Sequence, residues 1–340
     1  MLILHQSFST ISLSKSIDKL CSLADNNNVN EKGEKRSYII KEDKEPLETF
    51  CSLICFAYDE INKRDVVFKQ IKDINWAKKE LELMKKLEKN KVPNTIRLLD
   101  YYIDKETGDH ILVFPFLKKI NPYNMDLLNI QKLMKQLIST LKCLNNLNIA
   151  HLDITLSNLM CDEHDNLVLI DFGLSLDCGL KPHPIGCGTP GFIAPELFDG
   201  TCNTCTPDVY SSGIVFGILL QPYLPKCGLE NLGGRYTRSD TMTNIHDKLL
   251  ENYIYQSNNF RKSVIYITGV PLIVYKAADL LYKMTQHDPV DRIKPSDILR
   301  HPFMTAIESE FELCTYEKYT ERLHSMLIKH NTNQSYEYYS

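Results

Sequence analysis

Hydrophobic and polar positions divide the chain into a strand-rich segment followed by a helical one. Residues 52–58 and 65–71 are rich in β-branched and aromatic residues, and a charged turn, INKR, separates them, which predicts two paired strands. Residues 73–87 bring apolar side chains near one helical face, which predicts a helix. Two further strands are predicted at 96–102 and 111–117, joined by the turn DKETGD.

After residue 117 the pattern becomes helical. An apolar stripe at helical spacing consists of Ile130, Leu133, Met134, Leu137, Leu141 and Leu144. Two short strands are predicted around 159–160 and 167–170, and the remainder is mostly helical. The order predicts an α+β fold with a small N-terminal β-sheet lobe that carries one helix and a larger, mainly helical C-terminal lobe.

Polarity along the chain predicts its domain organisation. Residues 1–36 are polar in their second half and are expected to be a flexible leader. The two lobes are expected at 37–117 and 118–304, with a polar insertion in the second lobe at about 226–262. Residues 305–340 are expected to form a C-terminal helical and polar tail.

Composition narrows the class of protein. Of the 340 residues, 43% are hydrophobic and 24% are charged, which is typical of a soluble globular protein. A net charge of −4 argues against direct nucleic-acid binding by general electrostatics. No membrane span is expected, because the best candidate, 264–274, is too short and is broken by Gly269 and Pro271.

The chain has eleven cysteines with no regular spacing and no convincing signal peptide before them. We therefore expect reduced thiols in a nuclear or cytoplasmic protein that is not secreted. The close pair Cys202 and Cys205 leaves a zinc site as the less favoured alternative, because no second pair lies at a matching spacing.

The strongest motif is HLDITLSN at 151–158, followed by DFG at 171–173. These segments resemble the catalytic loop H-R-D-x-x-x-x-N and the D-F-G of protein kinases. The resemblance covers about 38–304 and continues through GTPGFIAPE (188–196), DVYSSG (208–213), DPVDR (288–292) and HPF (301–303). It implies a bilobal protein-kinase fold, ATP with Mg²⁺, and a protein substrate phosphorylated on serine or threonine.

The resemblance assigns the chemistry to a few side chains. Asp153 is expected to accept the proton of the attacking hydroxyl, as a catalytic base. Asn158 and Asp171 are expected to bind Mg²⁺, because their oxygens are the hard ligands that this ion prefers. The first lobe should supply Lys69 for the phosphates and Glu80 to pair with that lysine.

Two alternatives stay open in the first lobe. Lys69 taken alone could be a surface lysine of a strand. Glu82 is a rival for Glu80, although it would face the other side of the helix from Leu81 and Met84.

The same resemblance predicts a nucleotide pocket. Val67 is expected to lie on the adenine, and Phe114 is the expected gatekeeper. Phe116 and Leu117 belong to the hinge, whose backbone groups would hydrogen-bond the adenine edge. Leu47, in the first hairpin, is a further expected nucleotide contact.

Other matched residues are expected to be structural. Glu196 and Arg292 should form a buried ion pair, and Asp208 should accept hydrogen bonds from the backbone of the catalytic loop.

Met84, His151 and Phe172 are expected to form a packed stack that links the lobes. His151 is therefore interpreted as a packing residue, with a catalytic base as the alternative.

The sequence departs from the kinase pattern at the glycine-rich loop. Pro46, Glu48 and Cys51 stand where glycines are usual. Glycine lets backbone N–H groups approach phosphates, whereas proline has no N–H and glutamate repels the nucleotide. We therefore expect weak ATP binding.

The catalytic loop departs from the pattern twice. Thr155 replaces the usual lysine, so no positive charge is supplied there, which is expected to cost rate. Leu152 replaces the arginine that normally holds a phosphorylated activation loop, and that loop offers only Ser175 and Thr189 as hydroxyl candidates. Activity without loop phosphorylation is expected.

Among protein kinases, the hinge FPFL (114–117), the segment GTPGFIAPE and the run TFCS (49–52) resemble the cell-division-cycle-seven kinases. These are catalytic subunits of the Dbf-dependent kinase that triggers DNA replication. The resemblance implies an activating regulatory subunit and a nuclear location. Against it, such kinases usually carry long insertions, whereas 171–196 is short.

Two other functions compete with an active kinase. A pseudokinase that serves as a scaffold is motivated by the lost glycines and by Thr155. A small-molecule kinase is disfavoured by the full APE segment at 194–196, which is suited to docking a peptide.

Overall fold

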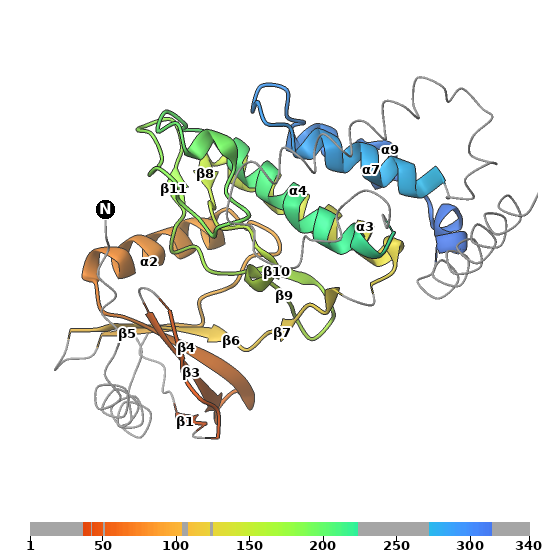
Figure 1. Cartoon of the computed structure of the whole chain (residues 1–340). Helices are drawn as coiled ribbons and strands as arrows, with labels where there is room; N and C mark the ends of the chain where they lie inside the picture. Colours follow the sequence, from red (N-terminus) through yellow and green to blue (C-terminus); the bar gives the residue numbers. More distant parts are fainter. Residues whose placement is uncertain are drawn as a thin grey trace, which may run out of the picture. The chain divides into compact units, whose positions relative to one another are not determined.

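The computed structural model describes residues 37–41, 43–49, 52–103, 108–122, 125–223 and 272–314 (Figure 1). The predicted leader at 1–36, the predicted insertion at 226–262 and the part of the predicted tail after residue 314 lie outside the described residues. The chain divides into two compact units, Met1–Lys118 and Lys119–Ser340. Their junction falls within the two-residue strand β7 (Lys118–Lys119).

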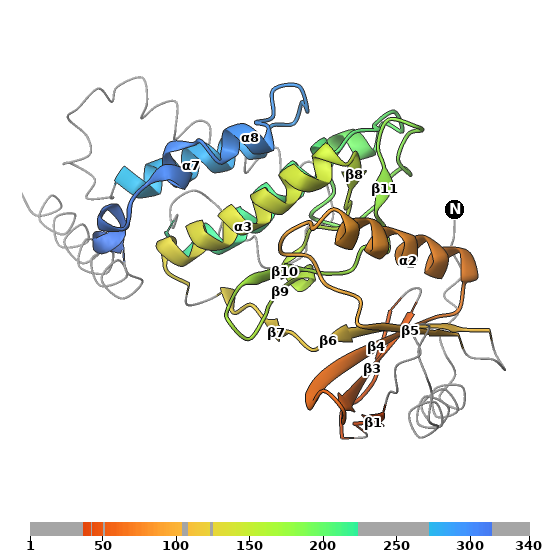
Figure 2. The same ribbon diagram turned by 180° about the vertical axis from the view of Figure 1, so that it is seen from behind.

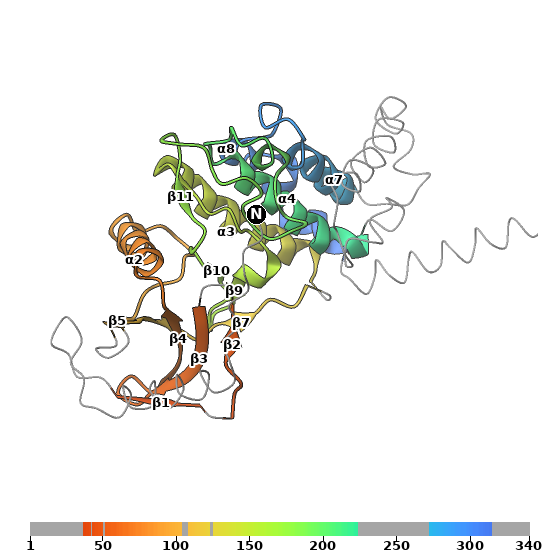
Figure 3. The same ribbon diagram turned by 60° about the vertical axis from the view of Figure 1, so that its left-hand side comes forward.

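The first unit contains an antiparallel sheet of order β1-β3-β4-β6-β5, in which β2 also pairs with β3 (Figure 3). Its strands are β1 (Tyr38–Ile40), β2 (Leu47–Glu48), β3 (Ser52–Asp59), β4 (Arg64–Ile71), β5 (Asp100–Ile103) and β6 (His110–Pro115). The second unit is mainly helical, so the predicted α+β fold class is confirmed.

Two predicted strands are too long, and the one predicted at 111–117 ends at Pro115. The apolar run 96–102 forms a strand only from Asp100. Before it, Asn94 has a left-handed φ of 52°, and the Thr95 hydroxyl donates to the Val92 carbonyl at 3.1 Å. The chain is therefore still turning where the apolar run begins, and the pattern of side chains could not reveal this.

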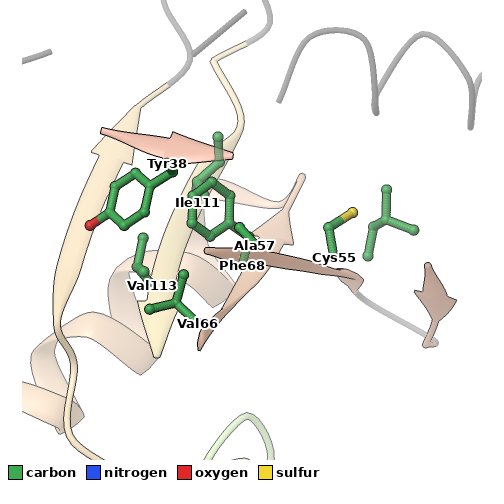
Figure 4. Close-up of a cluster of buried hydrophobic side chains, with 8 residues drawn as sticks. Tyr38, Cys55, Ala57, Val66, Phe68, Ile111 and Val113 are labelled. Carbon is green, nitrogen blue, oxygen red and sulfur yellow. The ribbon is translucent and has the colours of Figure 1, made fainter. Parts of the chain in front are cut away.

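One face of the sheet buries a core cluster drawn from β1, β3, β4 and β6. Tyr38 and Phe68 meet edge to face, with ring centroids 5.1 Å apart. Alternate residues of each strand point to the same face, so every second position is buried here. The cluster comprises Tyr38, Leu53, Cys55, Ala57, Val66, Phe68, Ile111 and Val113 (Figure 4).

Helix α2 (Ile74–Lys89) packs against β4 and β6. The side chain of Asp73 caps it by accepting from the N–H groups of Asn75 and Trp76, which would otherwise lack partners at a helix start. The buried side chains recur at helical spacing, as the sequence predicted: Ala77, Glu80, Leu81, Met84 and Leu87.

The second unit is built around α4 (Thr206–Leu220), which contacts both α3 (Leu127–Asn146) and α7 (Leu272–Met284) (Figure 1). Figure 2 shows α3 and α7 from the opposite side. Nearly every residue of α4 is buried. A Cβ at Gly213 would lie 2.7 Å from Thr285 Cγ2, so glycine is what permits the close approach beside α7. Two short helices complete this part, α8 (Pro295–Ile298) and α9 (Pro302–Thr305).

Two small antiparallel ribbons lie in the same unit. Strand β8 (Ile149–Ala150) pairs with β11 (Leu176–Asp177), and β9 (Leu159–Cys161) pairs with β10 (Leu167–Leu169). The 3-10 turns are η2 (Leu156–Asn158), η3 (Pro195–Leu197), η4 (Gln221–Tyr223) and η6 (Glu308–Cys314). Within the described residues, no helix combines the length and apolar character that a membrane crossing requires.

The predicted ion pair between Glu196 and Arg292 is confirmed. Arg292 Nη2 lies 2.9 Å from Glu196 Oε2, and the exposed fractions of the two side chains are 1% for Arg292 and 8% for Glu196. Arg292 also donates to the Thr206 and Gln286 carbonyls. The guanidinium therefore joins η3 to the start of α4 and to the segment after α7.

We expect Glu196→Ala to lower the free energy of unfolding by about 3–5 kcal/mol, because it leaves the buried Arg292 charge uncompensated. Chemical denaturation monitored by circular dichroism measures this loss. The control is Arg300→Ala, since Arg300 is 80% exposed and lies 3.5 Å from Asp297. Its effect should stay within about 0.5 kcal/mol. Equal losses in the two variants would contradict a structural role for the buried pair.

Candidate active site

The first unit holds a buried ion pair between β4 and α2. Lys69 Nζ lies 2.7 and 2.9 Å from the two carboxylate oxygens of Glu80. Both side chains are buried, whereas Glu82 is exposed. Lys69 is therefore no surface lysine, and Glu80 rather than Glu82 is its partner. Burial of two charges is tolerated here because each satisfies the other.

Val67 shares the sheet face of Lys69, because the two are two residues apart on β4. In the strand register Val67 is opposite Phe114 and Lys69 is opposite Leu112. Phe114 is buried and Val67 is half-buried. The predicted adenine contact, the predicted gatekeeper and the predicted phosphate-binding lysine thus line one face of the sheet.

The predicted hinge residues differ in their surroundings. The Phe116 N–H donates to the Asp65 carbonyl at 3.1 Å, so this amide is used within the unit. Lys44 Nζ lies 4.5 Å from the Phe116 ring centroid. Leu117 is buried, whereas Leu47 on β2 is 53% exposed.

The turn between β2 and β3 satisfies its own polar groups. The Thr49 N–H donates to the Ser52 carbonyl at 2.9 Å, and the Ser52 N–H donates to Thr49 Oγ1 at 3.1 Å. The two hydroxyls are 2.7 Å apart. Residues 50 and 51 lie outside the described residues, and the second of them is Cys51, one of the positions where a glycine is usual. The side chains at this turn bond to each other, where a glycine-rich loop would present backbone N–H groups.

In the second unit, Asp153 is held by three hydrogen bonds. Its Oδ1 accepts from the Thr189 N–H at 2.9 Å and from the Thr189 hydroxyl at 2.6 Å. Its Oδ2 accepts from Asn158 Nδ2 at 2.9 Å. Hydrogen bonds to an ionised acceptor are strong, so they fix the orientation of the carboxylate.

Asn158 and Asp171 lie at the same end of the β9–β10 ribbon. Asn158 immediately precedes β9, and the Ile170 N–H extends the ribbon by donating to the Asn158 carbonyl at 3.0 Å. Asp171 follows with a left-handed φ of 59° and is exposed. The ribbon therefore brings together the two predicted magnesium ligands, which are 13 positions apart in the sequence.

His151 is fully buried and both of its ring nitrogens have backbone partners. Nδ1 accepts from the Asp153 N–H at 3.2 Å, so Nε2 carries the proton and donates to the Ile170 carbonyl at 3.1 Å. The ring meets Phe172 edge to face at 4.7 Å. These contacts favour the packing interpretation of His151 over the catalytic base. The contact of this pair with Met84 stays a prediction.

Asp208 holds the catalytic loop, as predicted. Its carboxylate accepts from the N–H groups of His151 at 2.7 Å and Leu152 at 2.8 Å. Burial raises the pKa of the Asp208 carboxyl, and His151 together with the two backbone N–H groups acts in the opposite direction. Leu152 has a left-handed φ of 67°, which is unfavourable for a leucine, and the second hydrogen bond helps to hold it there.

Gly188 lies against this loop. Its φ is 117°, and a Cβ placed on it would lie 2.6 Å from the Leu152 carbonyl oxygen. Glycine is therefore required for the activation segment to approach the loop, and the next residue is Thr189, which contacts Asp153.

Thr155 caps the turn that carries Asn158. Its hydroxyl oxygen accepts from the Asn158 N–H at 3.3 Å and lies 2.8 Å from the Ser157 hydroxyl. The residue is buried. The side chain at this position thus supports the local backbone instead of supplying a charge.

Asn158 and Asp171 carry the side-chain oxygen atoms that Mg²⁺ binding requires. Asn158 uses its amide nitrogen on Asp153, which leaves the amide oxygen to face a cation, and Asp171 supplies a carboxylate. Mg²⁺ typically takes one or two such protein oxygens and completes its shell with phosphates and water.

The surroundings of the Cys202–Cys205 pair bear on the less favoured alternative of a zinc site. Among the described residues, no group of three or more His, Cys, Asp or Glu side chains is placed to hold a metal ion. Cys205 instead contacts Cys178, and Cys202 lies 3.7 Å from the Thr204 hydroxyl.

The contact between Thr189 and Asp153 was missed by sequence reasoning. The sequence indicates Thr189 as a candidate hydroxyl for phosphorylation. Its distance of 36 positions from Asp153 gave no signal of contact. Only the φ of Gly188 and the path of the segment bring the two together.

A family model described as protein kinase domain matches residues 54–304. A probable serine/threonine-protein kinase, mkcD, from Dictyostelium discoideum is 29% identical over 173 residues, which cover 50% of this chain and 23% of that protein. The serine/threonine-protein kinase PLK4 of Drosophila ananassae is 28% identical over 175 residues, which cover 51% of this chain and 20% of that protein. PLK4 of Xenopus tropicalis is 27% identical over 229 residues, which cover 64% of this chain and 22% of that protein. In each case the match spans less than a quarter of the relative's length.

Proposed function

The chain belongs to the protein kinase domain family, and we propose on that basis that it transfers the γ-phosphate of ATP to serine or threonine hydroxyls of proteins. The observation that carries this proposal is the Asp153 carboxylate, fixed by Thr189 and by Asn158. Such a carboxylate is oriented to receive the proton of an incoming hydroxyl. The three named relatives are a probable serine/threonine-protein kinase and two PLK4 serine/threonine-protein kinases, which supports the same residue class as substrate.

Each unit contributes a different part of the proposed reaction. Asp153 accepts the substrate proton, while Thr189 holds Oδ1 of its carboxylate and keeps that group oriented. Lys69 neutralises phosphate charge, and Glu80 keeps its ammonium in place. Mg²⁺, when held by Asn158 and Asp171, neutralises the charge on the phosphates of ATP. Val67, Phe114, Leu117 and Leu47 are the proposed contacts of the nucleotide, with the carbonyl of Phe116.

Two features support slow or weak turnover. Thr49 and Ser52 bond to each other, and Pro46 has no N–H at a position where glycine is usual. Thr155 caps a turn and adds no charge.

These features also motivate the competing proposal of a scaffold without catalysis. Retention of the buried Lys69–Glu80 pair and of Asp153 with Asn158 favours the active enzyme, because a scaffold needs none of them.

Replacing Asp153 with alanine should lower the rate of phosphate transfer by about 10²–10⁴-fold, because general base assistance is lost. The measurement is incorporation of labelled phosphate into a generic protein substrate with Mg·ATP. Glu163→Gln is the matched control, since Glu163 is exposed and lies in the same unit. It should keep the parent rate. An equal background signal from parent and Asp153→Ala would favour the scaffold and reject the kinase.

We further propose that the activation segment does not require phosphorylation. Leu152, at the usual arginine position, is buried in an apolar cluster with Ala194, Leu197 and Tyr210. Ser175 is buried and its hydroxyl donates to the His151 carbonyl at 3.3 Å. The Thr189 hydroxyl is bonded to Asp153. Apolar packing and these internal bonds hold the segment where a phosphate would otherwise be needed.

Phosphatase treatment should therefore leave the transfer rate unchanged within about twofold, since no phosphate-dependent contact is lost. Intact mass before and after treatment verifies that phosphate has been removed, and a phosphorylated casein in the same reaction controls for phosphatase activity. Loss of activity that returns on phosphorylation of Ser175 or Thr189 would disprove independence.

As a finer assignment, we propose that the chain is related to the cell-division-cycle-seven kinases. It would then act in cell-cycle or DNA-replication control, in the nucleus, with an activating regulatory subunit. The supporting features are the TFCS run at 49–52 and the FPFL hinge at 114–117. The relatives identified by comparison are other serine/threonine-protein kinases, so this assignment rests on these motifs alone.

Affinity purification of the tagged full chain from its native cells should recover one partner at a one-to-one ratio. Adding that partner to the isolated chain should raise the transfer rate, because a regulatory subunit acts by completing the active kinase. The Asp153→Ala variant should bind the same partner without activity. Purification with no stoichiometric partner, and full activity of the chain alone, would rule out the finer assignment but not the kinase.

A further inference from the structure

Two thiols from distant parts of the second unit meet beside the catalytic loop. Cys178 directly follows β11, and Cys205 directly precedes α4. Their sulfur atoms are 2.7 Å apart, although the residues are 27 positions apart in the sequence. Both side chains are partly exposed, so a small solute can reach them.

The backbone around the pair is fixed on both sides. The Cys178 N–H donates to the Asn148 carbonyl at 2.7 Å, and the Gly179 N–H donates to the Asn203 carbonyl at 2.7 Å. Cys205 Sγ is also 3.3 Å from the Ile149 carbonyl oxygen. The two sulfurs are therefore held in contact by the backbone hydrogen bonds of Cys178 and Gly179 and by the bond from the Cys205 thiol to Ile149.

The two thiols differ in chemical character. The hydrogen bond to Cys178, together with burial, raises the pKa of the Cys205 thiol. Cys205 donates its single S–H to the Ile149 carbonyl at 3.3 Å, so it stays protonated while its sulfur lies against that of Cys178. Since the deprotonated form of a thiol is the nucleophile, Cys178 is the better candidate to react first with an oxidant.

We propose that Cys178 and Cys205 are an oxidation site that a peroxide converts into an intramolecular disulfide. The Cys178 thiolate attacks one peroxide oxygen, the O–O bond breaks, and Cys178 becomes a sulfenic acid while hydroxide leaves and takes a proton. The Cys205 sulfur then attacks Cys178 and displaces hydroxide, which takes the Cys205 proton. Two thiols lose two electrons, and the peroxide is reduced to two molecules of water.

The location of the bond gives it a consequence for the fold. It would join the segment after the DFG motif to the start of α4, whose Asp208 holds the His151 and Leu152 amides. A cross-link between positions that already touch restricts the unfolded chain more than the folded one. Oxidation should therefore stabilise the existing arrangement, whether or not the chain transfers phosphate.

The test treats the folded full chain with equimolar hydrogen peroxide, blocks the remaining thiols by alkylation, and maps disulfides by mass spectrometry without reduction. We expect a peptide linking Cys178 to Cys205 as the dominant product. The oxidised chain should melt at a temperature higher by about 3 °C or more, and a reductant should reverse the shift.

Cys178→Ser and Cys205→Ser should each abolish the linked peptide and the thermal shift. In Cys205→Ser, the sulfenic acid should persist on Cys178 and react with dimedone, which keeps the test informative if the link itself is absent. Cys202→Ser is the matched control, because Cys202 lies in the same cluster and should leave the link intact.

Three results would overturn the proposal. The first is a dominant disulfide between other cysteines, and the second is an equal yield of the Cys178–Cys205 link from chain unfolded in urea. The third is dimedone labelling of Cys205 in Cys178→Ser without labelling of Cys178 in Cys205→Ser. Because the readouts are a cross-linked peptide and a melting temperature, their failure would leave the proposed phosphate transfer untouched.

Discussion

A buried carboxylate, Asp208, holds the loop that carries the candidate chemistry. It accepts the backbone N–H groups of His151 and Leu152, one of which belongs to a leucine in a left-handed conformation. Two buried amides need partners, and a strained backbone needs a fixed environment, so one side chain meets both requirements. Asp208 is positioned for this because α4 is almost wholly buried and contacts both α3 and α7. The position of Asp153 thus depends on the packing of a helix with no chemistry of its own.

The two candidate groups of charged residues are stabilised in different ways. Lys69 and Glu80 are buried and neutralise each other, so their geometry follows from the cost of an unpaired charge. Asp153 is only half-buried and is oriented by neutral donors from Thr189 and Asn158. Neutral donors orient the carboxylate without placing a cationic partner on it. Each arrangement suits the chemistry proposed for it.

The sequence predicted the elements well where spacing is regular. The α2 face, the β3 and β4 strands and the ribbon that carries Asn158 all follow from periodicity and turn residues. Motif resemblance predicted the Lys69–Glu80 and Glu196–Arg292 pairs. Side-chain pattern alone could not reveal that the chain is still turning at Asn94, because that depends on local backbone angles.

Contacts between loops were the hardest to predict. The hydrogen bonds of Thr189 to Asp153 and the meeting of Cys178 with Cys205 both join segments of irregular structure. Periodicity carries no information about such segments, since their path is set by turns and by single glycines. The Thr49–Ser52 turn is similar, because a sequence shows which glycines are missing but not which side chains take over their hydrogen bonds.

Gly188 is a point at which the segment that carries Thr189 passes close to the loop that carries Asp153. The space that a methyl group would need is already filled by the carbonyl oxygen of Leu152, and the neighbouring threonine contacts the proposed base. Any side chain here would displace the segment that carries Thr189 and the loop that carries Asp153 together. A substitution at this single position would therefore move both partners of the contact at once.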